Sequence, residues 1–136
     1  MLDTDTVSNL MHGRSARLQS RIDALKDSAE LCISVITEAE MLYGMALKPG
    51  AHKLARSVEL ILAGFEILPW TSEAAAAYGH FRAENRRCGL AAGNLDMLIA
   101  AQAIAVGAVL VTSDAAIAKL AGGLVTANWA DDMRPN

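Results

Sequence analysis

The sequence has few of the features that define several common protein classes. It contains only two cysteines and three histidines, and none of these residues shows the spacing of metal ligands or of a disulfide framework. We therefore expect free thiols rather than a disulfide or a zinc site. The most apolar stretch, Met97–Thr112, is shorter than the ~20 residues that cross a membrane, and Gln102 interrupts it. We expect no membrane helix.

Repeats, low-complexity blocks and linkers are also missing from the sequence. The chain has 136 residues, of which 53% are hydrophobic and 20% charged, and this is the composition of an ordered protein. Its length suits one domain, residues 1–136, with a real core. No basic segment precedes an apolar one near Met1, so we expect no secretory signal and a cytoplasmic location.

Short β-like runs alternate with helical runs along the chain. Hydrophobic patterning predicts five strands, at Met1–Asp3, Leu31–Ile36, Phe65–Leu68, Ala108–Thr112 and Leu124–Thr126. Helices are predicted between them, at Val7–His12, Ser15–Lys26, Glu38–Leu47, Ala51–Ala63, Ser72–Arg87 and Leu95–Val106, with a short one after Asp114. Strands that are apolar on both faces and alternate with helices indicate a parallel sheet covered on both sides, which is an α/β sandwich.

Acidic residues follow several of the predicted strands, and sites in such folds form beyond the carboxyl ends of strands. Asp3 and Asp5 lie at the end of the first strand, and Asp114 follows the fourth. Glu40 lies in the first turn of the helix predicted after the second strand. Asp96 opens a helix that leads almost directly into the fourth strand, so this helix should run antiparallel to it. The five acids are therefore predicted at one edge of the sheet.

These acids also have a structural interpretation. Asp96 and Asp114 suit helix caps, and the TEAE segment Thr37–Glu40 fits a capping box. Caps, however, have no reason to gather at one edge of a sheet. Clustered carboxylates repel one another unless a cation is bound, and oxygen ligands without His or Cys favour Mg²⁺ or Mn²⁺ over zinc. The pattern predicts metal-dependent cleavage of phosphoesters.

The net charge of −3 argues against a nucleic-acid partner unless the negative charge is localised. If five of the 15 acids hold a cation, the remaining ten face 12 Lys and Arg, and the rest of the chain is slightly basic. Two clusters of arginines lie in helical segments: Arg14, Arg17 and Arg21, and then Arg82, Arg86 and Arg87. A solvated helix face and contact with phosphate explain either cluster equally well.

Five segments occur in the order of a known family: MLDTDT at the start, ISVITEAEMLYG at 33–44, ILPWTSEAAAAYGHFRAENRRCG at 67–89, LDMLIAAQAIAVGAVLVTSD at 95–114 and GLVTANW at 123–129. In these segments the sequence resembles PIN-domain proteins, particularly the VapC-like ribonuclease toxins of bacterial toxin–antitoxin pairs. The resemblance spans nearly the whole chain. It implies a three-layer α/β/α sandwich with a short central parallel sheet.

The same resemblance implies roles for individual residues. The acids that are catalytic and bind the metal in the family fall here on Asp3, Glu40, Asp96 and Asp114. Thr4 and Thr112 match polar positions near the metal, and Gln102 stands where many such toxins have His, deep enough in a helix to affect packing rather than chemistry. The implied cofactor is Mg²⁺ or Mn²⁺. The implied partners are an RNA substrate, a cognate antitoxin protein and a second copy in a homodimer, with no membrane.

Asp5 departs from the family, whose members more often have Asn there, and it suits an extra ligand, an acceptor beside the ligands or a cap of the first helix. The DTDTV segment also satisfies the Asp-x-Asp-x-Thr/Val signature of haloacid-dehalogenase phosphatases, with Asp3 as nucleophile and Asp5 as general acid. That class needs a downstream Lys and a late acidic motif, for which Lys119 and the DD pair at 131–132 are poorly placed. A PIN fold that binds RNA or protein without cutting is the third interpretation.

Overall fold

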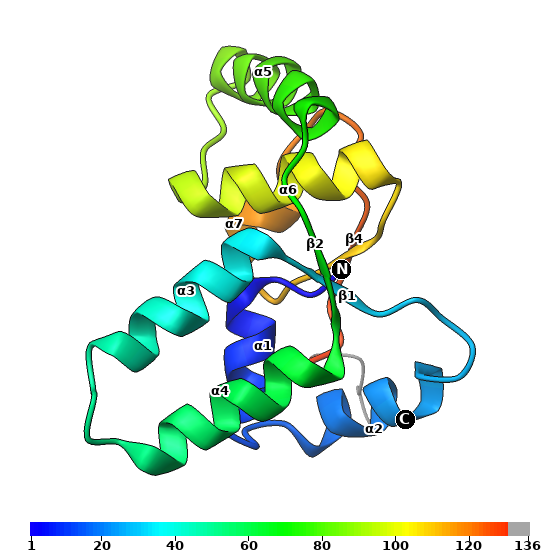
Figure 1. Cartoon of the computed structure of the whole chain (residues 1–136). Coiled ribbons are helices and arrows are strands. Elements are labelled where there is room, and N and C mark those ends of the chain that lie inside the picture. Colours follow the sequence, from blue (N-terminus) through cyan, green and yellow to red (C-terminus); the bar gives the residue numbers. More distant parts are fainter. Residues whose placement is uncertain (131–136) are drawn as a thin grey trace.

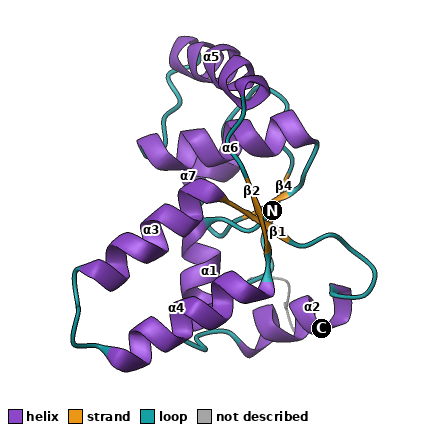
Figure 2. Ribbon diagram, in the orientation of Figure 1, coloured by secondary structure: helices purple, strands orange, loops and turns teal. Residues whose placement is uncertain are grey.

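The structure is a computed structural model that describes residues 1–130 (Figure 1). The helices of this part of the chain are α1 (Thr4–Met11), α2 (Ala16–Leu25), α3 (Val35–Ala46), α4 (His52–Gly64), α5 (Ser72–Arg87), α6 (Asn94–Val106) and α7 (Ala115–Ala118). The strands are β1 (Cys32–Ser34), β2 (Glu66–Leu68), β3 (Leu110–Val111) and β4 (Thr126–Ala127). Figure 2 shows that helices surround a small central region of strand.

The strands form a short parallel sheet. β1 pairs with β2 and β3 pairs with β4, both in parallel. Leu2 joins the two pairs through parallel bridges to Ile33 of β1 and Val111 of β3. The order across the sheet is therefore β2, β1, Leu2, β3 and β4. The strand predicted at Met1–Asp3 is reduced to this single bridging residue, because Asp3 already caps the following helix.

Successive residues of the sheet point to opposite sides, and the buried core divides accordingly. One buried cluster, shared with α5, α6 and α7, takes from the sheet region Met1, Cys32 and Leu110. A second cluster, shared with α1, α2, α3 and α4, takes their immediate neighbours Leu2, Ile33 and Val111. Figure 1 shows α5 and α6 on one side of the strands and α1, α2 and α4 on the other. The α/β fold with three layers is confirmed.

Side chains at helix starts explain where the observed boundaries differ from the predicted ones. Asp3 accepts a hydrogen bond of 2.7 Å from an amide in the first turn of α1, so this helix begins directly after it rather than at Val7. Ser34 accepts a hydrogen bond of 3.0 Å from an amide in the first turn of α3, so that helix begins at Val35 instead of Glu38. β1 is therefore shorter than the predicted strand Leu31–Ile36.

The remaining predicted elements are present with small shifts. β4 begins where the predicted strand Leu124–Thr126 ends. α6 ends at Val106 and is capped by Gly107, whose φ of +67° is a left-handed conformation that glycine adopts without strain. The chain then turns back into β3, as the sequence predicted. No helix in residues 1–130 is both long enough and apolar enough to cross a membrane.

Gln102 ties α6 to the end of β2. Its side chain is fully buried, and its Nε2 donates hydrogen bonds to the carbonyls of Leu68 at 3.1 Å and Pro69 at 2.9 Å. Two partly buried backbone acceptors at the end of a strand are thereby satisfied, whereas Oε1 of the same side chain is buried without a hydrogen-bond partner. The residue acts in packing, in keeping with the sequence-based prediction.

The substitution Gln102→Leu is expected to destabilise the protein by roughly 1 kcal/mol, because the loss of two hydrogen bonds to partly buried carbonyls is offset in part by removal of the unpartnered Oε1. The urea midpoint of unfolding, at unchanged slope, measures this loss. Gln19→Leu, on the exposed face of α2, is the matched control and is expected to shift the midpoint little. Equal midpoints for wild type and Gln102→Leu would show that the two hydrogen bonds contribute nothing.

Candidate active site

The structure places the starts of α1, α3, α6 and α7 on the same side of the strands, beyond their carboxyl ends (Figure 1). The acids that the sequence singled out lie at these helix starts or, for Glu40, in the second turn of the helix. They are Asp3, which caps α1, Asp5 in its first turn, Glu40 in α3, Asp96 in the first turn of α6 and Asp114, which caps α7. Four separate segments thus contribute carboxylates to one edge.

Asp96 shows how close the other acids are. Its carboxyl is partly buried, and desolvation together with surrounding negative charge raises its pKa from 3.8 to about 6. Desolvation is the largest cause. The negative charges that add to it are those of Glu40, Asp3, Asp5 and Asp114. We call these five carboxylates, including that of Asp96, the acidic cluster. Asp96 is the member whose pKa is affected by all four others.

Gly93 leaves the space that the Asp96 carboxylate occupies. A β-carbon at position 93 would lie 2.6 Å from Oδ2 of Asp96, closer than real β-carbons approach other atoms. Gly93 is also the N-cap of α6 and provides no side-chain cap. The interpretation of Asp96 as a helix cap is therefore wrong, and its carboxylate is available for another partner.

Asp3 and Asp114 combine a capping role with a place in the acidic cluster. Oδ1 of Asp3 accepts a hydrogen bond from the amide of Thr6, and Oδ1 of Asp114 accepts one from the amide of Ala116, each at 2.7 Å. A carboxylate has two oxygens, so a cap made with one leaves the other able to bind a cation. The role of Asp114 as the cap of α7 is therefore compatible with a role in binding a cation.

Glu40 is held by a hydroxyl from another helix. The Thr4 hydroxyl of α1 donates a hydrogen bond to Oε2 of Glu40 and lies 3.1 Å from the hydroxyl of Thr37. Because α3 begins at Val35, Glu40 lies in its second turn rather than its first. The capping-box interpretation of Thr37–Glu40 is wrong, since both side chains meet Thr4 instead. This contact fixes the Glu40 carboxylate within the acidic cluster.

Asp5, for which the sequence left several roles open, is also a member of the acidic cluster. It lies within the first turn of α1, so it is not the cap of that helix. Partial burial raises the pKa of its carboxyl, and the charges of Asp3 and Asp114 add to this effect. The four acids selected by the family resemblance do not include Asp5, whereas its position at the end of the first predicted strand did place it among the five acids at this edge.

Thr112 supports the cluster through the backbone. Its hydroxyl is buried at the end of β3 and accepts a hydrogen bond of 3.0 Å from the amide of Asp114. This contact sets the turn that leads from the strand into the Asp114 cap. Thr4 and Thr112 therefore position carboxylates, one directly and the other through the chain.

The donor set suits a hard divalent cation, although the side chains are not closed around one. Carboxylate oxygens are the ligands that Mg²⁺ and Mn²⁺ prefer. Within residues 1–130, no three His, Cys, Asp or Glu side chains are close enough to form a complete cation cage. Repulsion between like charges keeps such groups apart, and a cation offsets it. The residues fit such an ion if their carboxylates close on it.

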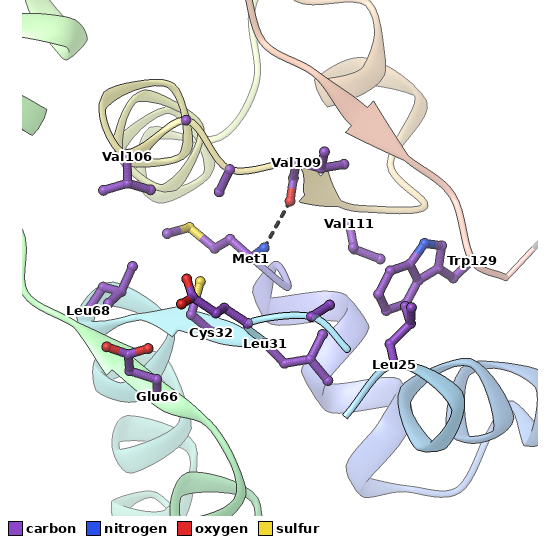
Figure 3. A pocket seen from close by; sticks show the side chains of 14 residues that line it. Met1, Leu25, Leu31, Cys32, Glu66, Leu68, Val106, Val109, Val111 and Trp129 are labelled. Carbon is purple, nitrogen blue, oxygen red and sulfur yellow. Dashed lines mark hydrogen bonds between the residues drawn. The ribbon is translucent and has the colours of Figure 1, made fainter. Parts of the chain in front are cut away.

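A cavity of about 430 Å³ lies at the opposite end of the sheet (Figure 3). Its walls include Met1, Cys32 and Val109, which lie at the amino ends of their strands, and the Met1 ammonium donates a hydrogen bond of 2.9 Å to the Val109 carbonyl. The acids that line it are Glu30 and Glu66, not those of the acidic cluster. The cavity is therefore separate from the candidate active site.

Comparison with known proteins assigns this chain to a family. The sequence profile of the PIN domain matches residues 1–123. The chain belongs to the PIN-domain family. Its PIN relatives include ribonuclease VapC2 from Rickettsia felis, 30% identical over 129 residues that cover 95% of this chain and 96% of the relative. The tRNA(fMet)-specific endonuclease VapC from Shigella flexneri is 28% identical over the same shares of the two chains.

Solved PIN structures share the fold. A chain in the crystal structure of VapBC2 from Rickettsia felis, bound to a DNA fragment from the promoter, gives a TM-score of 0.88 at 28% identity. That comparison covers 95% of this chain and 97% of the other. VapBC-1 from nontypeable Haemophilus influenzae gives 0.84 at 27% identity, over 95% and 96% of the two chains. The likeness to VapC-like ribonucleases is confirmed.

Membership of the PIN family removes the phosphatase interpretation of the DTDTV segment. The nucleophile of that interpretation, Asp3, is 2% exposed and caps a helix with one of its oxygens. Lys119 is the C-cap of α7. The acidic pair at 131–132 lies outside the described residues.

Proposed function

We propose that this chain is the metal-dependent endoribonuclease toxin of a toxin–antitoxin pair, formed by a single domain over residues 1–136. One observation carries the proposal: burial, together with carboxylates from three other segments of a PIN-domain chain, raises the pKa of Asp96. Relatives that cover nearly the same length are named ribonucleases and endonucleases. RNA is accordingly the proposed substrate.

The proposed catalytic and metal-binding residues are Asp3, Glu40, Asp96 and Asp114. When bound, Mg²⁺ or Mn²⁺ supplies an activated water and neutralises charge on the phosphoryl group. Thr4 keeps the Glu40 carboxylate in place, and the Asp3 and Asp114 caps fix the χ angles of those side chains. Asp5 completes the negative field but is not assigned as a ligand.

An antitoxin protein and a second copy of the chain are the proposed protein partners. The solved structures similar to this chain include VapBC complexes, which supports the antitoxin. Large apolar side chains are exposed on the second half of α3 and at its C-cap, in the part of the molecule where α3 and α4 extend away from the sheet (Figure 1). They are Leu42, Tyr43 and Leu47. An exposed apolar surface of this kind favours contact with another protein.

The purified chain, free of any partner, is expected to cut single-stranded RNA internally when Mg²⁺ or Mn²⁺ is present. Chelation of the cation by EDTA is expected to stop cleavage, and its replacement to restore it. Gel analysis of an end-labelled RNA, beside DNA of the same sequence as a control, measures the products. RNA that is bound but left intact with either cation would favour the non-catalytic PIN interpretation instead.

A further inference from the structure

RNA must approach an edge of the protein that is strongly negative. Each nucleotide brings a charged phosphate, and the acidic cluster holds five carboxylates. Divalent ions neutralise only the phosphate that they contact directly. The phosphates on either side are repelled unless the protein supplies positive charge beside the cluster.

Positive charge lies beside the start of α6, close in the chain to Asp96. A pocket of about 310 Å³ opens there between the end of α5 and the start of α6. Its lining consists of Arg82 and Arg86, the connecting residues 89–92 and Met97. We call this the arginine pocket. It has no acidic residue in its lining, whereas Met97 directly follows Asp96 in the chain.

Arg82 is exposed yet held in position. Its Nη2 donates a hydrogen bond of 3.1 Å to Oδ1 of Asn94, and its Nη1 donates one to the hydroxyl of Tyr78. The guanidinium also lies over the Tyr78 ring, 5.5 Å from its centroid, and Trp70 packs edge-on against that ring at 6.2 Å. A guanidinium has five N–H donors, so these contacts orient it and leave donors for a ligand.

Arg86 lies one turn further along α5, on the same face as Arg82. Arg87 has the same charge and lies in the same last turn, but it does not line the pocket. The arginine cluster noted in the sequence is therefore divided by the fold. Two of its members converge and the third points elsewhere.

We propose that the arginine pocket binds a backbone phosphate of the RNA next to the scissile one, with Arg82 and Arg86 as its ligands. This inference rests on the proposed function. Planar, preorganised guanidinium groups pair with phosphate oxygens through two hydrogen bonds, which suits Arg82. The subsite contacts the backbone only, so it adds affinity and sets the position of the strand without reading its sequence.

A purely structural role for Arg82 is the competing explanation, because its contact with Asn94 joins α5 to α6. The two explanations differ in what they predict for binding. A structural link affects unfolding and leaves the salt dependence of RNA binding unchanged. A phosphate ligand changes that dependence, since each phosphate contact in single-stranded nucleic acid contributes roughly 0.7 to the slope of log Kd against log salt concentration.

The test measures binding of a fluorescein-labelled, 12-nucleotide single-stranded RNA of mixed sequence by fluorescence anisotropy at several salt concentrations. All variants carry Asp96→Asn, so that the RNA stays intact. Arg82→Ala and Arg86→Ala are each expected to weaken binding roughly tenfold and to lower the salt slope, by at most roughly 0.7 because both arginines contact the same phosphate. Arg87→Ala is the matched control and is expected to change the slope much less. Arg82→Lys keeps the charge and the slope but not the full affinity.

Equal affinities and slopes for Arg82→Ala, Arg86→Ala and Arg87→Ala would overturn the subsite, and so would a slope that falls equally in all three. Arg82→Lys guards against misfolding, because a binding loss in Arg82→Ala that lysine restores in part, at the wild-type slope, is a charge effect at this position. RNA cleavage by the chain that retains Asp96 is measured separately, so that a failure of the phosphate subsite can be told from a failure of the nuclease function. If this chain cuts RNA but the arginine substitutions leave RNA binding unchanged, only the subsite fails. If they matter for binding and no cation supports cleavage, only the nuclease function fails.

Discussion

Replacement of Asp96 by Asn is expected to lower the rate of RNA cleavage on the order of a thousandfold, because it removes the carboxylate on which the field of the other four acids converges. Asparagine has almost the same size and keeps an oxygen, so the pocket beside Gly93 remains filled. The loss therefore reports charge rather than shape. Cleavage of an end-labelled RNA in Mg²⁺ or Mn²⁺ and growth arrest on expression both measure it.

Stability separates this effect from unfolding. A carboxyl whose pKa is raised by burial and repulsion is unfavourable in its charged form, so Asp96→Asn should be at least as stable as wild type at neutral pH without metal. Asp23→Asn, on the exposed face of α2, removes one charge far from the acidic cluster and is expected to cleave normally. An Asp96→Asn protein that is folded and cuts RNA at the wild-type rate would show that Asp96 is not catalytic.

The gathering of the acids at one edge of the sheet was predictable because it depends on features that are local in the sequence. Each acid follows a strand end or opens a helix that returns to the sheet, and parallel strands must end at a common edge. The same local reasoning fails where caps compete with strands. Asp3 and Ser34 both start helices earlier than the apolar pattern indicates, since a polar side chain that accepts an amide hydrogen bond ends the strand there.

Contacts between distant segments were beyond the reach of the sequence. The hydroxyl that holds Glu40 comes from Thr4, 36 residues away, and only the packing of α1 against α3 brings them together. The arginines of α5 had two equal interpretations until Asn94 and Tyr78 fixed the direction of Arg82. In both cases the residue type was visible in the sequence, whereas its partner depends on how helices cross.

Without divalent cations, the protein is expected to lose stability as the pH rises from about 4 to about 6. The pKa of Asp96 is 3.8 in its ordinary state and about 6 in the folded chain, so between these values the unfolded state releases the proton and the folded state retains it. The contribution of Asp96 is therefore fully present below pH 4 and is lost as the pH passes 6. The raised pKa of Asp5 acts in the same direction.

A divalent cation is expected to reverse this loss, because it binds the charged carboxylates of the folded state only. At a concentration of 100 times its Kd, Mg²⁺ or Mn²⁺ should add about 2.7 kcal/mol, which corresponds to a rise in Tm of roughly 10 °C for a domain of this size.

Thermal unfolding followed by circular dichroism at pH 5 and pH 7.5 measures both effects, with NaCl at matched ionic strength as the control for screening. The rise in Tm should be larger at pH 7.5 than at pH 5 and much reduced in Asp96→Asn, whereas Asp23→Asn should respond like wild type. A rise that is the same at both pH values and in all three proteins would place the cation elsewhere on the chain, because only a site that includes Asp96 competes with its proton.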